Sequence, residues 1–473
     1  MANEPSGPVP PPPAGPGPWR SPLNRSLDTV WKFIENRAGI KTWALRGQPA
    51  FTFNPSYWTG AFVATAFLVQ VLTGLLLLLY YVPSASPAVA GAPPQAWAST
   101  NYIITSVPMG WLLLSSHLYG AYATIFLAFV HFFRGFYTGV YKPPRELSWM
   151  VGTLLLVAML GMGFTGYLLP YTALAVGATN VGISLTLSVP TLGPFAARLL
   201  ISDGTHQGLL SRMFALHVVV IPLALAGLLY AHLSLFESHG IAPKATSDPR
   251  AKNTFTEEDD KKVGRFFPKV FLYMTKWGLL YVGMLLLIAA AWPWQLPVYF
   301  GSTTGAASPE PDWYFLWLYK LADFQYVTPA VAVGVVTALV VFVLFLPWIV
   351  QILPWLDGGK RRHPRDRPAM VFLANFLVSF FILMTIWGGI MPGVQIPATI
   401  YGTYIAILVA ANAVPLLILY PLYKSNYRRR LLERELERKS AAPAEGLVRA
   451  PTPLPSAPRP TAAPANQEAA PRA

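Results

Sequence analysis

Eight apolar segments, each close to 20 residues long, constrain this chain more than any other feature of its sequence. A helix of that length crosses ~30 Å of hydrocarbon. Only 12% of the residues are charged, against about 25% in an ordinary soluble domain. The sequence therefore predicts an all-α polytopic membrane protein with transmembrane helices at about 58–82, 112–133, 147–169, 212–236, 270–292, 328–350, 368–389 and 399–422.

The polar segments around these helices predict the domain organisation. A charged linker at 246–269 divides the spans into two bundles of four: an N-terminal bundle at 21–245, with an interfacial helix, and a C-terminal region at 270–425. Residues 1–20 are rich in proline, and residues 426–473 are basic and then rich in proline and alanine. Such compositions cannot bury a core, so we expect disordered tails.

Lysine and arginine are concentrated in alternate loops. The loops after the second, fourth, sixth and eighth spans are basic, whereas each of the other four loops and turns carries at most one lysine or arginine. Basic loops stay in the cytoplasm, so we expect both termini there. The net charge of +14 thus reflects topology, and nucleic-acid binding is not expected.

Four of the seven histidines lie within predicted spans: His117 and His131 on the second, His217 and His232 on the fourth. Fourteen helical residues rise about 21 Å and nearly complete four turns, and fifteen leave a rotation of about 60°. Because both spans run inward, His117 should face His217 in the outer leaflet and His131 should face His232 in the inner one. Two bis-histidine sites predict two b-type haems, and the lack of cysteine makes them non-covalent.

Glycines repeat the same interval on the neighbouring spans. Gly60 and Gly74 lie fourteen residues apart on the first span, as do Gly152 and Gly166 on the third. Glycine lets a helix approach a flat macrocycle closely, so these spans should flank the two haem levels. A zinc site is disfavoured because the histidine pairs lie about 20 Å apart without a carboxylate. A transporter with structural histidines would need polar groups near the midplane or broken helices.

These residues, together with several motifs, resemble the cytochrome b subunit of cytochrome bc-type quinol:cytochrome c oxidoreductases, in the bacterial single-chain form with eight helices. The resemblance covers about residues 45–425. Besides the four histidines and the glycine pairs, the motifs that carry it are HFFRGFYTGVYKPPRELSW (131–149), GFTGYLLP (163–170), SRMFALH (211–217), PDWYFLW (311–317) and PWLDGGKRRHPRDRP (354–368).

The resemblance implies a respiratory or photosynthetic complex that oxidises quinol at the outer face of the bacterial inner membrane. One electron would pass to a Rieske iron–sulfur protein and on to a c-type cytochrome subunit, and the other through both b haems to quinone at the inner face, contributing to a proton gradient. The chain would not be active alone, and the complex is expected to be a homodimer. A di-haem membrane anchor of a quinone-linked dehydrogenase is the alternative, but it does not explain eight spans with a PDWY motif.

The resemblance also implies site residues. At the outer quinol site, Asp312 and Tyr314 are the catalytic candidates, because quinol loses protons as it is oxidised and needs a base. The same pocket should be lined by Pro311, Trp313, Gly177, Ala178 and Thr179. At the inner quinone site the candidates are Glu237, His239 and Lys269, although a charged residue at the interface is more often structural. Arg212 and Arg134 should neutralise the propionates of the outer and inner haem.

The chain departs from the family pattern at three points. Asp312 stands where many relatives have glutamate, and the shorter side chain changes its reach. Leu114 stands where many relatives have an arginine, three residues before the first histidine, so one partner of an outer propionate is missing. Photosynthetic relatives attach an extra haem through a cysteine, and this chain has no cysteine for that bond.

Overall fold

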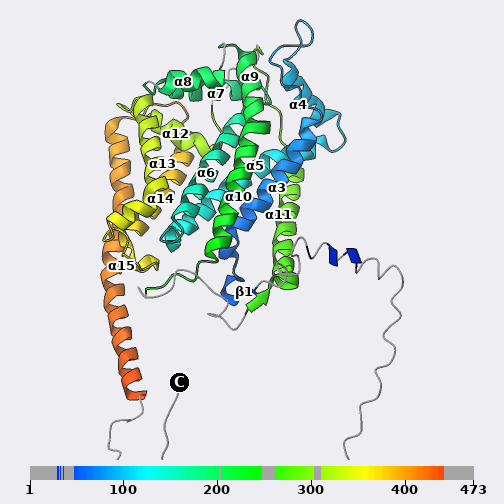
Figure 1. Cartoon of the computed structure of the whole chain (residues 1–473). Helices are drawn as coiled ribbons and strands as arrows, with labels where there is room; N and C mark the ends of the chain where they lie inside the picture. The colour runs from blue at the N-terminus through cyan, green and yellow to red at the C-terminus, as the bar shows by residue number, and fades with distance from the viewer. Residues whose placement is uncertain are drawn as a thin grey trace, which may run out of the picture. The chain divides into compact units, whose positions relative to one another are not determined.

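The computed structural model describes residues 47–190, 192–201, 204–247, 263–302 and 310–441, and five positions between 29 and 36. Within them, eight helices are long and apolar enough to cross a membrane, which confirms the predicted fold class (Figure 1). The spans are α3 (Thr59–Leu78), α5 (Gly110–Thr138), α6 (Glu146–Tyr167), the continuous α9–η3–α10 (His206–Ala215, Leu216–Val220, Ile221–His239), α11 (Phe271–Ala291), α13 (Pro329–Ile352), α14 (Pro368–Ile390) and α15 (Ala398–Ala441).

Shorter elements join the spans. Besides helical turns, the described residues contain one small antiparallel sheet, in which Gly47 pairs with Arg265. The short elements are β1 (Gly47–Pro49), η1 (Ala50–Thr52), η2 (Pro55–Tyr57), α4 (Gln95–Thr105), α7 (Ala173–Leu187), α8 (Leu192–Ile201), β2 (Val263–Arg265), η5 (Phe266–Val270), α12 (Trp313–Ala322) and η6 (Pro364–Asp366). The predicted tail at 1–20 and most of the predicted interfacial helix lie outside the described residues.

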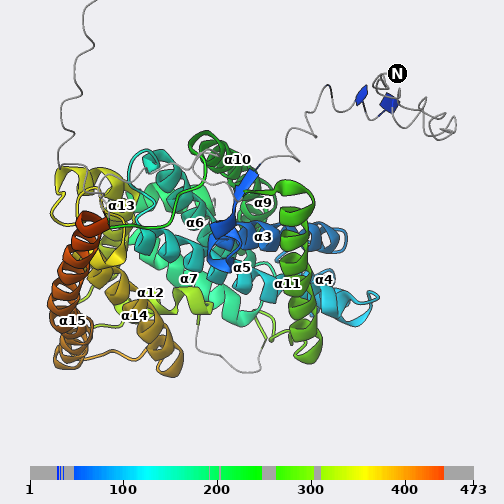
Figure 2. The same ribbon diagram turned by 90° about the horizontal axis from the view of Figure 1, so that it is seen from below.

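The N-terminal spans pack as two helix pairs, α3 against α5 and α6 against α10. The fifth span, α11, packs along α3 and α5, while α13 contacts α6 and α14 contacts α5 (Figures 1 and 2). The short helix α12 lies against α14, where Gly388 leaves room for the backbone of Leu316. These contacts enclose α5 and α6, so the residues between them are screened from the bilayer. The division into two bundles of four remains a prediction.

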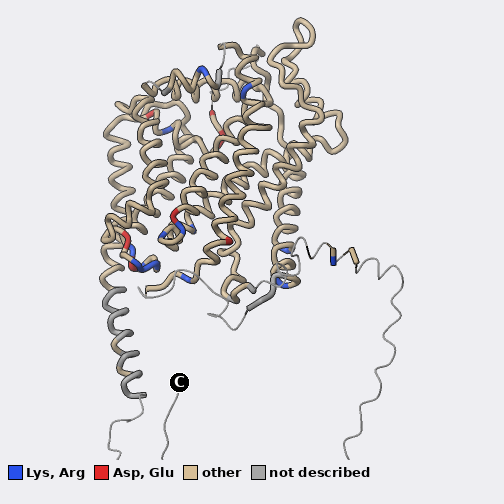
Figure 3. The backbone as a smooth tube through the Cα atoms, viewed as in Figure 1, with Lys and Arg blue, Asp and Glu red and all other residues tan. Residues whose placement is uncertain are grey.

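Most of the described lysines and arginines lie at the end that carries β1 (Figure 3). We call this the inner end and the opposite one the outer end, after the predicted orientation. Several inner cations are buried. Asp357 pairs with Lys142 at 3.2 Å and with Arg367, and Arg367 also donates to the carbonyl of Phe136. Burial lowers the pKa of Lys142 to about 8, against the opposing effect of Asp357. These bonds join the loop after α5 to the loop before α14.

The last helix corrects one sequence expectation. Residues 426–441, expected to belong to a tail, continue α15 to Ala441. The segment is rich in leucine, arginine, glutamate and lysine, which are strong helix formers. The chain divides into two compact units, Met1–Leu416 and Leu417–Ala473, and the helix runs from the first into the second. The remainder of the predicted tail, 442–473, lies outside the described residues.

Candidate functional site

The four membrane histidines form two pairs with the same geometry. The ring centroids of His117 and His217 lie 6.4 Å apart with an interplanar angle of 81°, and those of His131 and His232 have the same values. Two imidazole nitrogens each about 2.0 Å from a shared metal ion put the ring centroids about 6.3 Å apart. An edge-to-face aromatic pair also falls within about 4.5–7 Å, so separation alone does not identify a site. The exact repetition at two depths favours a shared ligand over two accidental contacts.

The extra residue between His217 and His232 is absorbed by a π-helical turn. The span is α-helical up to Ala215, turns as π-helix over Leu216–Val220 and becomes α-helical again at Ile221. Pro222 at the start of α10 has no N–H to continue a regular helix. A π turn contains one more residue than an α turn, so the spacing of fifteen behaves like the spacing of fourteen on α5. The rotation of about 60° expected from sequence is thereby removed.

Each predicted glycine lies against one of the histidine rings. A Cβ added at Gly60, Gly74, Gly152 or Gly166 would lie 2.5–3.2 Å from the Cε1 atom of His131, His117, His232 or His217, respectively. The helices α3 and α6 thus approach the rings from the side, two glycines at each level. The glycines thus contact the edges of the imidazole rings. The sequence analysis expected them to allow close approach to the macrocycle.

Hydrogen bonds indicate which ring nitrogen is free to bind a metal. The Nδ1 atom of His217 lies 3.1 Å from the carbonyl oxygen of Met162. A carbonyl can only accept, so this Nδ1 carries the proton and Nε2 keeps its lone pair. The residues therefore fit bis-histidine haem sites, and the chemistry of the ligand set suits iron.

The two arginines predicted to neutralise haem propionates differ in their surroundings. Arg134 lies with its guanidinium carbon 4.5 Å from the ring centre of Tyr57, and its buried Nε has no hydrogen-bond partner among the described residues. An unpartnered buried donor of this kind suits a carboxylate ligand. Arg212 donates to the carbonyl of Leu199 at the outer end.

A cavity of about 490 Å³ opens at the outer end, between α6, α7, α8, α12 and α13. Its lining is largely apolar, and its few polar groups include Thr179, Tyr167, Tyr314 and Asp312. This size and composition are typical of a site for a small organic molecule. Of the residues predicted for the outer site, Pro311 and Ala178 also line the cavity. Gly177 and Trp313 are not among the lining residues, and the Trp313 ring instead packs on Phe381.

The carboxylate of Asp312 is held by two phenols. Its Oδ1 accepts a hydrogen bond from Tyr122 at 2.6 Å, and its Oδ2 accepts one from Tyr314 at 2.8 Å. Burial raises the pKa of Asp312, and the two hydrogen bonds oppose that effect. Gly163 makes the arrangement possible, because a Cβ there would lie 2.6 Å from the Tyr314 hydroxyl. The carboxylate thus borders the cavity, at a place where it can accept a proton from a bound molecule.

Sequence reasoning missed Tyr122 and Lys320. Tyr122 lies on α5, 190 residues before Asp312, and a single tyrosine in a span gives no sign of that contact. In the sequence, Lys320 is the one basic residue of the loop between the fifth and sixth spans. In the structure it lies on α12, is fully buried and donates to the carbonyls of Met391 and Val394 at 2.8 and 2.9 Å. It anchors the helix that begins at Asp312.

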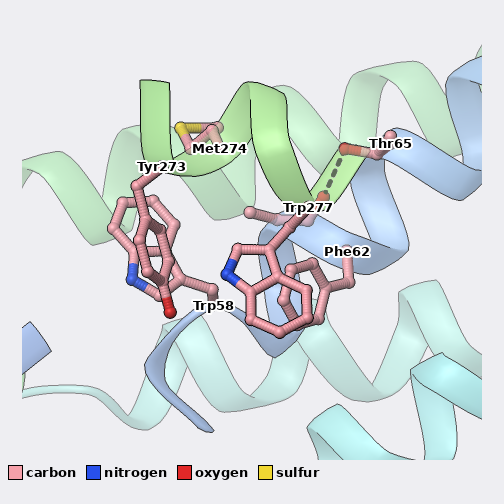
Figure 4. Close-up of a pocket in the computed structure, with 7 residues that line it drawn as sticks. Trp58, Phe62, Thr65, Tyr273, Met274 and Trp277 are labelled. Carbon is pink, nitrogen blue, oxygen red and sulfur yellow. Dashed lines mark hydrogen bonds between the residues drawn. The ribbon is translucent and has the colours of Figure 1, made fainter. Parts of the chain in front are cut away.

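A small pocket lies near the inner end of the described helices. Trp58, which precedes α3, and Phe62 within α3 face Tyr273 and Trp277 of α11 (Figure 4). The pocket between these four rings has a volume of about 10 Å³. Lys269, predicted for an inner quinone site, lies over the Phe53 ring at 4.7 Å, and Phe53 packs edge-on against Tyr273.

The other two inner candidates lie at the end of α10. The Nδ1 of His239 bonds to the carbonyl of Leu235 at 2.8 Å, and Glu237 is exposed. Of the three predicted residues, Lys269 is therefore the one connected by ring contacts to the pocket.

Comparison with known proteins gives concordant matches. Residues 122–298 match the family model described as cytochrome b(N-terminal)/b6/petB, and residues 304–421 match cytochrome b(C-terminal)/b6/petD. Cytochrome b of Sulfolobus acidocaldarius is 34% identical over 394 residues, covering 77% of this chain and 67% of the relative. The menaquinol:cytochrome c reductase cytochrome b subunit of Geobacillus thermodenitrificans is 39% identical over 198 residues, covering 40% of this chain and 85% of the relative.

A solved structure shares the fold. A chain of the hyperthermophilic respiratory Complex III superposes with a TM-score of 0.63 at 24% identity, covering 83% of this chain and 98% of that chain.

Proposed function

This chain belongs to the cytochrome b family and is the cytochrome b of a bc-type quinol oxidoreductase complex, and from that membership we propose that it binds two b-type haems and oxidises quinol at its outer end. The observation that carries the proposal is the repeated histidine pair, with rings 6.4 Å apart at both levels. When bound, the haems would supply two one-electron carriers between the outer cavity and the inner end.

In this proposal, the Nε2 atoms of His117 and His217 hold the outer haem, and those of His131 and His232 hold the inner one. The four glycines allow α3 and α6 to close on the rings. Arg134 donates to a propionate of the inner haem through its unpartnered Nε. Arg212 has the same task at the outer haem, where it shares its guanidinium with the carbonyl of Leu199.

At the outer cavity, Asp312 accepts a proton from the quinol hydroxyl, and Tyr314 orients the acceptor. The apolar lining excludes water and receives the ring and part of an isoprenoid tail. Thr179, Ala178 and Pro311 line the cavity together with the acid, and Gly177 precedes Ala178 on α7. Buried Lys320 keeps α12, and with it Asp312, at a fixed depth.

The remaining parts of the reaction need partners. A Rieske iron–sulfur protein takes one electron and a c-type cytochrome receives it, in line with the reductase name of the Geobacillus relative. The second electron reduces quinone at the inner end, where Lys269 is the best-connected candidate, with Glu237 and His239 nearby. We place the complex, as a homodimer, in the bacterial inner membrane with both termini of this chain in the cytoplasm, where its turnover contributes to a proton gradient.

A redox difference spectrum of the purified complex tests the haem assignment. The wild type should show two b-type haems, and His131→Ala should lose the inner haem while the outer haem stays bound. The control His239→Ala removes an imidazole that is outside both pairs and should keep both haems. Two haems at normal stoichiometry in His131→Ala would refute the pairing. Two haems without quinol:cytochrome c activity in the wild-type complex would favour the dehydrogenase anchor instead.

A further inference from the structure

The residue that precedes each of the four glycines occupies an equivalent position on α3 or α6, and three of these residues contact a histidine ring. In chain order these residues are Thr59, Thr73, Val151 and Thr165. Three of them carry a hydroxyl and the fourth does not. Valine and threonine have nearly the same shape, so the difference between the positions is one polar atom.

The outer histidines have the richer set of polar contacts. Thr73 Oγ1 lies 2.8 Å from His117 Nδ1. Thr165 Oγ1 lies 3.2 Å from His217 Nδ1, beside the carbonyl of Met162. The hydroxyls of Thr73 and Thr165 donate to carbonyls of their own helices, at 2.8 and 2.9 Å. Their oxygens are thus left to accept from the ring N–H.

The inner histidines have fewer such contacts. Thr59 Oγ1 lies 3.0 Å from His131 Nδ1. At His232 the corresponding residue is Val151, and the buried Nδ1 has no hydrogen-bond partner in the described part of the chain. The carbonyl of Ser148, which corresponds to that of Met162 at the outer level, is the group it approaches, without hydrogen-bond geometry.

We infer that the residue before each glycine sets the electron affinity of the adjacent haem, and that Val151 makes the inner haem the better electron acceptor. A hydrogen bond from Nδ1–H to an acceptor makes imidazole a stronger donor to the metal. A stronger donor stabilises ferric over ferrous iron and lowers the reduction potential. Because His232 lacks such an acceptor, the potential of the inner haem is higher than it would be with a threonine at position 151.

The inference rests on the proposed function only in requiring two bis-histidine haems. It assigns a positioning role to side chains that act on the histidine ligands rather than on a haem or a quinone directly. It also explains why a valine stands at one of four otherwise equivalent positions. The loss or gain of one hydrogen bond should shift the electron partition between the haems by about threefold to tenfold, or ~30–60 mV at 59 mV per decade.

Redox titration of the two b haems in the purified complex tests the inference. In Val151→Thr the potential of the inner haem should fall, and in Thr165→Val that of the outer haem should rise, each with the other haem unchanged. The double variant should narrow or reverse the gap between the two potentials. Thr65→Val on α3 is the control, because the Thr65 hydroxyl bonds to the carbonyl of Ala61 and to no histidine.

The outcomes separate this inference from the proposed function. An inner potential that stays the same or rises in Val151→Thr, with both haems present, would overturn the inference and leave the haem assignment intact. If haem content in the wild-type complex differs from two, the proposed function fails first. Should Thr165→Val not assemble, Thr73→Val makes the same prediction for the outer haem through His117.

Discussion

Two cavities at opposite ends of the described helices differ in the room they leave for a small molecule. The outer cavity measures about 490 Å³, whereas the aromatic pocket between α3 and α11 holds about 10 Å³, roughly the space of one water. A quinone ring can enter the first without rearrangement, but it can enter the second only if Trp58, Tyr273 or Trp277 moves. The proposed oxidation site is thus preformed, while a reduction site at the aromatic pocket would form on binding.

The ends also differ in how they use charge. The outer cavity has one acid, Asp312, held by neutral phenols and raised in pKa by burial. The inner end has buried cations around a single carboxylate, Asp357. The first arrangement leaves a group free to change its protonation state, and the second fixes loops in place. Removing one carboxylate at each end tests whether Asp312 takes part in the reaction and whether Asp357 has only a structural role.

Replacement of Asp312 by asparagine should have the largest effect on the comparison. Loss of a general base typically costs 10²–10⁴-fold in rate, so quinol oxidation in Asp312→Asn should fall by about 10²-fold or more. Both haems should remain bound, because no histidine contacts Asp312. Steady-state reduction of cytochrome c and the haem spectrum measure the two properties.

Glu310→Gln is the matched control, since it removes a nearby carboxylate that makes no side-chain hydrogen bond to the two phenols. An unchanged rate in Asp312→Asn would show that the base lies elsewhere and that the outer cavity is a binding site only.

Replacement of Asp357 by asparagine should instead destabilise the fold. Lys142 and Arg367 would remain buried without a carboxylate, and breaking such a pair typically costs about 3–5 kcal/mol. We expect less assembled complex and faster thermal loss of haem, with normal turnover per assembled complex. Lys360→Gln, in the same loop but exposed, should have no effect on either property. Reduced turnover at normal thermal stability would contradict a purely structural role.

Removal of the Tyr122 hydroxyl should have the smallest effect, on pH dependence. The carboxylate must be ionised to accept a proton, and burial already raises its pKa. Losing one hydrogen bond raises the pKa further, so in Tyr122→Phe the acidic limb of the rate should move to higher pH, by up to about one unit. The groups that face Asp312 are the phenols of Tyr122, Tyr314 and Tyr167, with no lysine, arginine or histidine among its described contacts.

Tyr119→Phe serves as the control for that shift. Tyr119 lies one turn earlier on α5 and donates to the carbonyl of Trp292 rather than to Asp312. A shift of equal size in both variants would mean that α5 has moved as a whole. A shift toward lower pH in Tyr122→Phe would contradict the assignment of Asp312 as the base.

The spans and the histidine pairs could be predicted from sequence because both depend on local spacing. Apolar runs set the helices, and loop charges set which histidines face each other. Contacts between distant segments could not be predicted in that way. The bond from Tyr122 to Asp312 and the burial of Lys320 depend on how α12 packs between other helices. The π turn at Leu216–Val220 was also missed, since Pro222 signals a break in hydrogen bonding but not its form.

The bonds around Asp357 have a consequence for covalent continuity. They join the loop after α5, within the first matched family region, to the loop before α14, within the second. The Geobacillus relative aligns over 198 residues, which make up 85% of its length but only 40% of this chain. A chain whose halves are held by buried charge does not depend on the peptide between α11 and α12 to keep them together. Two polypeptides divided there could assemble into the same structure.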